Sequence, residues 1–149
     1  MFYFPPTIIL RHQRENLKKC SLRGLESRDD MIFLTYPQSP LPDLSNYCCL
    51  TLDAPALTEA DAPWGLFLID GTWHHAKTMA KIIPLGVRQR SLPLTQTAYP
   101  RRQDDSRGLA SVEALYLAYQ ILGRETEGLL DHYYWKDQFL ENGRSAIMT

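Results

Sequence analysis

Three side chains of different chemistry, Asp70, Thr72 and Trp73, come directly after the apolar run 66–69. A carboxylate can accept a proton, a hydroxyl can cap a helix, and an indole can stack on a flat ring such as adenine. Four apolar residues followed by Asp and Gly predict a buried strand that ends here, with a helix beginning beside Thr72. In α/β proteins, ligands usually bind at such a turn from strand to helix.

The same residues fit a second interpretation, in which Asp70 and Thr72 only cap the helix. Helix caps are far commoner than active sites, so this interpretation is as strong as the functional one. Trp73 favours function modestly, because an indole in a first helical turn has little core in which to be buried. Both interpretations of Asp70, general base and structural cap, therefore stay open.

Short apolar runs bounded by turn residues predict the strands that position this turn. We expect strands at 7–10, 31–36, 47–52 and 66–69, with an edge strand at 88–92. A helix after Thr72 would carry an apolar stripe made of Ala76, Met79, Ala80 and Ile83. A helix at 111–122 is apolar on nearly every face, which predicts burial, and a last helix is expected at 127–141. This order predicts the α/β class, with a mostly parallel sheet and flanking helices.

The composition indicates one domain and excludes several classes of protein. A chain of 149 residues with 44% hydrophobic content is long enough for one sizeable core. It has no apolar run of the roughly 20 residues that a membrane span needs, and its start lacks the pattern of a signal peptide. We therefore expect a cytoplasmic protein, and a monomer. The three cysteines, Cys20, Cys48 and Cys49, predict neither a disulfide framework nor a zinc site, so no metal is expected.

Common enzyme motifs are missing from the sequence. Neither GxGxxG nor GxxxxGK[ST] occurs, so neither a dinucleotide nor a P-loop site is predicted, and no GxSxG nucleophile elbow is present. Lys18 and Lys19 would lower the pKa of the Cys20 thiol, but without a histidine partner a nucleophilic role is disfavoured. The two lysines fit contacts to phosphate better.

Positive charge is concentrated in two segments, although the net charge is −1. Residues 1–28 contain six basic and two acidic side chains, and residues 88–107 contain five basic and two acidic ones. If the two segments fold together, they would form one positive face for a polyanion, whereas the competing interpretation is solvated loop charge. His74, Lys77 and Lys81 have helical spacing and would extend that face, or form an ordinary solvated helix face.

Four segments, taken in order, resemble the Asp-Thr-Trp (DTW) domain family. The resemblance is closest to its ribosome-maturation branch, the rRNA aminocarboxypropyltransferases. The segments are Asn16-Leu17-Lys18-Lys19-Cys20-Ser21, the stretch 70–79, Arg90-Ser91-Leu92-Pro93 with Tyr99-Pro100, and Leu109-Ala110-Ser111-Val112-Glu113-Ala114-Leu115. Each segment alone is a weak signal, and the resemblance rests on the order and spacing of all four.

The resemblance implies a fold like that of the SPOUT RNA methyltransferases, with a C-terminal trefoil knot that binds S-adenosylmethionine. It implies a single domain over 1–149, with an RNA-facing part at 1–63 and a knotted, cofactor-binding part at 64–149. The implied enzyme transfers the 3-amino-3-carboxypropyl group to a uridine or pseudouridine base nitrogen in RNA and releases methylthioadenosine. A sulfonium has three carbons open to attack, so positioning decides which group is transferred.

The resemblance also suggests residues for each role. Asp70 is the candidate base that removes the proton of the ring nitrogen. The adenine would lie among Leu52, Pro55, Trp73, Leu92 and Leu109, and the amino-acid arm would lie near Ser21 and the helix start at Ser111, with Ala114 one turn further. The candidate RNA-binding residues are Lys18, Lys19, Arg23, Arg88, Arg90, Arg101 and Arg102.

Two departures from the family pattern concern the substrate. The segment 11–15 is basic where acidic residues often precede the Lys-Lys-Cys element, and Tyr99-Pro100-Arg101-Arg102 replaces the usual Asn-Pro context. The cysteine-rich N-terminal extension of the tRNA-modifying members is not in this sequence, which favours rRNA, within a small-subunit precursor. The alternatives are a tRNA-uridine aminocarboxypropyltransferase, a SPOUT-like methyltransferase and a non-catalytic RNA-binding module.

Overall fold

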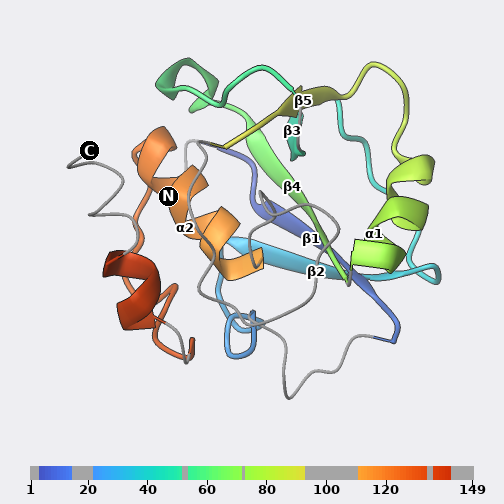
Figure 1. Cartoon of the computed structure of the whole chain (residues 1–149). Helices are drawn as coiled ribbons and strands as arrows, with labels where there is room; N and C mark the ends of the chain where they lie inside the picture. The colour runs from blue at the N-terminus through green and yellow to red at the C-terminus, as the bar shows by residue number, and fades with distance from the viewer. Residues whose placement is uncertain are drawn as a thin grey trace.

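A parallel sheet with helices on both faces forms the centre of the structure, a computed structural model (Figure 1). It describes residues 4–14, 22–51, 54–71, 73–92, 111–133 and 136–141, with Trp73 described only by its backbone. The named elements are β1 (Thr7–His12), β2 (Met31–Tyr36), β3 (Tyr47–Leu50), η1 (Glu59–Asp61), β4 (Gly65–Asp70), α1 (Trp73–Met79), η2 (Ala80–Ile82), β5 (Arg88–Arg90) and α2 (Ser111–Leu122).

The five described strands have the order β2-β1-β4-β3-β5, and every neighbouring pair is parallel. The predicted α/β class with a mostly parallel sheet is therefore confirmed. Strand β4 lies between β1 and β3, so strands from both sides of the expected boundary at 63/64 share one sheet. Because all strands run in the same direction, their carboxyl ends meet at one edge, which we call the C-terminal edge. In the register of β1 and β4, Arg11 is paired with Asp70 near this edge.

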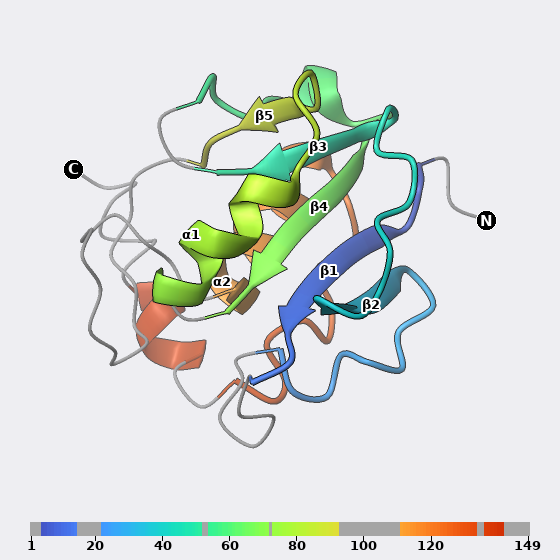
Figure 2. The same ribbon diagram turned by 90° about the vertical axis from the view of Figure 1, so that its right-hand side faces the viewer.

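Helices α1 and α2 lie on opposite faces of the sheet (Figure 2). Side chains alternate between the two faces along each strand. Ile9 of β1 and Leu68 of β4 belong to the larger apolar cluster, which α2 covers. Leu10 and Phe67 belong to the smaller cluster, which includes Met79 of α1. Strands that are buried on both faces are expected to be continuous apolar runs, as these are.

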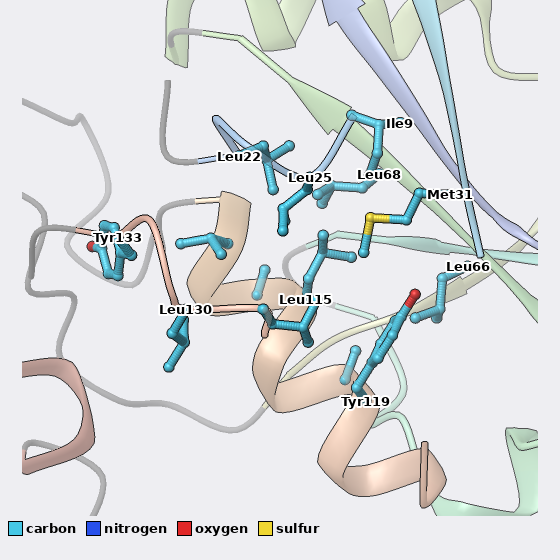
Figure 3. Packing of buried hydrophobic residues seen from close by; sticks show 14 of the residues in the cluster. Ile9, Leu22, Leu25, Met31, Leu66, Leu68, Leu115, Tyr119, Leu130 and Tyr133 are labelled. Atoms are coloured by element: carbon cyan, nitrogen blue, oxygen red, sulfur yellow. The ribbon is translucent and has the colours of Figure 1, made fainter. Parts of the chain in front are cut away.

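The larger cluster packs α2 against the sheet (Figure 3). Leu115 and Tyr119 of α2 are fully buried beside Leu66 and Met31 of the strands. The Tyr119 hydroxyl lies 2.7 Å from Oγ1 of Thr7 and donates to Oδ2 of Asp30 at 3.4 Å. This buried phenol therefore has the polar partners that its burial requires.

The predicted bounds of α2 are confirmed, but the continuous helix expected at 127–141 is wrong in its first half. Residues 127–132 form turns, and the described helical residues begin at 136. Gly128 has φ of 85°, a left-handed conformation that interrupts a right-handed helix. The trefoil knot stays a prediction, because residues 93–110 lie outside the described part of the chain. Among the described residues, no helix has the length and hydropathy needed to cross a membrane.

Candidate active site at the C-terminal edge

Asp70 ends β4 with its carboxylate almost completely buried, at 4% exposure. Oδ1 accepts a hydrogen bond from the hydroxyl of Ser111 at 2.8 Å, and Oδ2 accepts one from Nε of Arg11 at 3.2 Å. Arg11 comes from β1 and Ser111 begins α2, so this carboxylate links two neighbouring strands to the start of the buried helix. Charge-assisted bonds of this kind are about twice as strong as neutral ones.

Arg11 has a second acidic partner and an aromatic one. Its Nη1 lies 3.3 Å from Oε2 of Glu26, and its guanidinium lies 4.7 Å from the centre of the Phe33 ring. Burial would raise the pKa of Glu26, but the backbone N–H groups of Glu26 and Gly24 and the Arg11 guanidinium outweigh it and lower this pKa. Arg11 therefore joins a buried carboxylate at the sheet to an exposed one on the loop that follows β1.

The chain beyond β3 lies beside the chain beyond β5. Ser91 donates its backbone N–H to the carbonyl of Pro55 at 2.8 Å and its hydroxyl to the carbonyl of Ala54 at 2.7 Å. Leu57 returns a backbone bond to the carbonyl of Ser91 at 2.8 Å. Two of the expected adenine-site residues, Pro55 and Leu92, are thereby brought close in the fold. Pro55 is exposed, and Leu92 packs against the larger cluster.

The other expected cofactor residues are only partly described. Ser21, Leu52 and Leu109 lie outside the described residues, as does the side chain of Trp73. Ser111 belongs to the candidate site because its hydroxyl is bonded to Asp70. Ala114 is 7% exposed and belongs to the larger apolar cluster, so it packs beneath the helix start. The cofactor assignment stays a prediction for all eight residues.

The candidate RNA-binding arginines that the structure describes have different surroundings. Arg23 is exposed on the loop after β1. The guanidinium of Arg88 stacks 3.5 Å above the Trp64 ring, at the start of β5 and thus away from the C-terminal edge. Nε of Arg90 pairs with Oδ2 of Asp61 at 3.3 Å. Lys18, Lys19, Arg101 and Arg102 lie outside the described residues, so the single basic face stays a prediction.

Sequence reasoning missed a row of four aromatic rings at the C-terminal edge, formed by Tyr36, His12, His75 and His74 and called the ring row below. The imidazoles of His12 and His75 stack with centres 3.8 Å apart and planes 4° apart. Tyr36 lies 5.6 Å from His12, and His74 lies 5.7 Å from His75, both tilted. The row runs from β2 across β1 to α1, and only the strand register could have revealed it.

The electrostatics of the ring row favour neutral imidazole at His12. Burial lowers the pKa of His12, and the charges of His75 and Arg14 lower this pKa further. The backbone N–H of Arg14 donates to Nδ1 of His12 at 3.0 Å. Because Nδ1 accepts this bond, the ring proton of the neutral form lies on Nε2.

A buried carboxylate in α2 was also missed as a structural feature. Glu113 is fully buried two residues after Ser111, and its Oε2 accepts the hydroxyl of Tyr133 at 3.0 Å. The bond joins the start of α2 to the turns that follow the helix. In the part of the chain that the structure describes, no three His, Cys, Asp or Glu side chains are grouped to hold a metal ion.

Comparison with known proteins gives a structural relative. No family model matches the sequence, and no curated protein matches it. The fold is similar to that of the SAM-dependent rRNA:acp-transferase Tsr3 from Vulcanisaeta distributa, with a TM-score of 0.77 and 24% sequence identity. The match covers 97% of this chain and 82% of that protein. The chain therefore has the fold of Tsr3, as the resemblance to the aminocarboxypropyltransferase branch implied.

Proposed function

We propose that this protein transfers the 3-amino-3-carboxypropyl group of S-adenosylmethionine to a uridine or pseudouridine base nitrogen in RNA. The observation that carries the proposal is the Asp70–Ser111 hydrogen bond of 2.8 Å, which joins the turn after β4 to the start of α2. Both segments resemble motifs of the aminocarboxypropyltransferases, and the fold is similar to that of Tsr3. Because Tsr3 is an rRNA enzyme by name, rRNA is the favoured substrate class.

The residues at the C-terminal edge fit a bound S-adenosylmethionine in their chemistry. The adjacent segments 54–57 and 91–92 offer apolar side chains and backbone for an adenine, with Trp73 as the candidate stacking wall. The start of α2, a helix of 12 residues, favours a carboxylate such as that of the amino-acid arm. When bound, S-adenosylmethionine supplies an electrophilic carbon next to its sulfonium and leaves as methylthioadenosine.

Asp70 is the candidate acceptor for the proton that the base nitrogen loses. Its Oδ2 is held by the Arg11 guanidinium, whereas its Oδ1 is held by a hydroxyl that can rotate. The N–H of the acceptor base would replace Ser111 at Oδ1, and the freed Ser111 hydroxyl would donate to the carboxylate of the amino-acid arm. Arg11 then serves as a positioning residue that holds the Asp70 carboxylate in one orientation.

The test is product analysis with purified protein, S-adenosylmethionine and precursor rRNA. We expect methylthioadenosine in equal amount to an added aminocarboxypropyl group on the RNA, detected by mass spectrometry of nucleosides. S-adenosylhomocysteine in its place would refute arm transfer and support a methyltransferase. RNA binding without cofactor binding would support a non-catalytic RNA-binding module, and modification of tRNA alone would move the substrate to tRNA.

A further inference from the structure

The ring row lies one residue from the candidate active site, but on the other face of the sheet. Along β1, Arg11 points toward the α2 side, where it meets Asp70, and the next residue, His12, points toward α1 and stacks on His75. Gly71 follows Asp70, and a Cβ at this position would lie 3.4 Å from Cβ of His12 and 3.5 Å from that of His75. A strand of RNA that reaches the candidate active site across the C-terminal edge would therefore pass the row.

The rings of the row are accessible, and their geometry leaves faces for a ligand. Tyr36, His12 and His75 are half-buried, and His74 is exposed. The two inner imidazoles cover each other, whereas both outer contacts are tilted, by 33° at Tyr36 and 54° at His74. Neither outer ring is stacked on the inner pair, so a flat ligand ring would be added at the ends of the row.

The chemistry of the surrounding groups suits a nucleic-acid strand. Unpaired bases stack on tyrosine and histidine rings, and base recognition in RNA uses such platforms. The Nε2–H group of neutral His12 can donate to a carbonyl oxygen of a uracil, and Nδ1 is already engaged by the backbone of Arg14. The side chain of Arg14, two residues after His12, is exposed and can contact a phosphate.

We propose that the ring row binds unpaired nucleotides of the RNA next to the nucleotide that is modified. Tyr36 and His74 would each stack on a base, and His12 would donate to a base carbonyl. The inference rests on the proposed function only for the identity of the RNA, because the row can bind a single strand whether or not the protein transfers a group.

The experiment measures binding of a short, uridine-rich, single-stranded RNA by fluorescence anisotropy at fixed salt. His74→Ala and Tyr36→Ala should each weaken binding about tenfold, the usual scale for losing one base–aromatic stack. Tyr36→Phe keeps the ring and should bind like the wild type. His132→Ala, which removes an exposed histidine in the turns after α2, is the matched control and should change nothing. Circular dichroism of each variant shows that it is folded.

A second comparison separates base stacking from charge. The same RNA annealed to its complement should bind at least tenfold more weakly than the single strand, because paired bases cannot stack on the row. Equal affinity for single strand and duplex, or wild-type affinity of folded His74→Ala and Tyr36→Ala, would overturn the proposal. Calorimetry with S-adenosylmethionine runs beside it. If the wild type does not bind S-adenosylmethionine, the proposed function is overturned. The binding of RNA to the ring row can still be measured in that case.

Discussion

Replacing Asp70 with Asn tests both the energetics and the chemistry of the candidate site. The substitution keeps the shape of the side chain and one acceptor oxygen, but it removes the charge that Arg11 faces at 3.2 Å. The Arg11 side chain is 11% exposed, and its ion pair with Glu26, whose side chain is 43% exposed, would stay in place. The buried arginine would lose the better-shielded of these two counter-ions.

The size of the effect follows from these contacts. Breaking a buried ion pair by removing one partner costs about 3–5 kcal/mol, and a hydrogen bond to a charged group contributes about 1.5–3 kcal/mol. Because Glu26 stays in place and Asn still accepts a bond, we expect Asp70→Asn to lower the free energy of unfolding by about 2–3 kcal/mol. Typical domains have a free energy of unfolding of about 5–15 kcal/mol, so the variant should stay folded and its activity can be measured.

The assay combines urea unfolding with turnover. Unfolding of Arg11→Met, Asp70→Asn and the double variant should give a coupling energy of about 1.5–3 kcal/mol between the two residues. If Asp70 is the base, methylthioadenosine release by folded Asp70→Asn should fall about 10²- to 10⁴-fold and recover as the pH rises.

Two results would contradict this reasoning. Strictly additive losses in the double variant would show that the Arg11–Asp70 pair contributes no interaction energy. Near-normal turnover by folded Asp70→Asn would remove Asp70 from the proton transfer, and catalysis would then rest on positioning alone.

Four further predictions concern Trp73, the Lys18–Lys19 pair, His12 and Tyr119. Trp73→Ala should weaken S-adenosylmethionine binding by about 1–3 kcal/mol if the indole stacks on the adenine, and unchanged calorimetric affinity would refute that role. Replacing Lys18 and Lys19 together should flatten the salt dependence of RNA binding, and an unaltered slope would assign them to solvated loop charge. The lowered pKa of His12 means that the folded protein binds this proton less readily than the unfolded chain, so stability should fall as the pH drops below about 6.5. In His12→Gln, the urea midpoint should fall less at low pH than in the wild type. An identical pH profile of the two proteins would contradict this prediction. Burial raises the pKa of Tyr119 to about 12, so stability should be lost as the pH rises from about 10 toward 12, and Tyr119→Phe should abolish this component in alkaline unfolding curves.

The sheet and the buried helix could be predicted from the sequence because each has one strong local signal. The apolar run 31–36 is bounded by turn residues and became β2 with those bounds, and the all-round apolar pattern after Ser111 became α2. The helix expected at 127–141 had a weaker basis, since the described aromatic residues Tyr133 and Phe139 pack in the core without a continuous helix. Gly128 interrupts the helix with its left-handed φ, and the apolar pattern of the sequence did not indicate this interruption.

The candidate site could be predicted only at its centre. The strand-to-helix turn after β4 identified Asp70, because an apolar run that ends in a carboxylate is a local pattern. The partner Arg11 was visible only as a departure from a family pattern, since pairing it with Asp70 requires the register of β1 against β4. The ring row depends on the register of β1 against β2, which pairs His12 with Tyr36, and on the position of α1, so no local periodicity could indicate it.

The alternation of side chains along β1 places the two proposed tasks, proton transfer and RNA binding, on opposite faces of the sheet at one edge. Arg11 faces the α2 side, where low exposure strengthens its bond to Asp70, and a buried ion pair suits a carboxylate that must keep one orientation. His12 faces the other side, where half-exposed rings meet solvent and can exchange water for a base. A proton acceptor needs a fixed, dry position, whereas a strand of RNA needs an accessible one. If consecutive residues of this strand serve the two proposed tasks, substitutions at His12 should change RNA affinity and substitutions at Arg11 should change turnover.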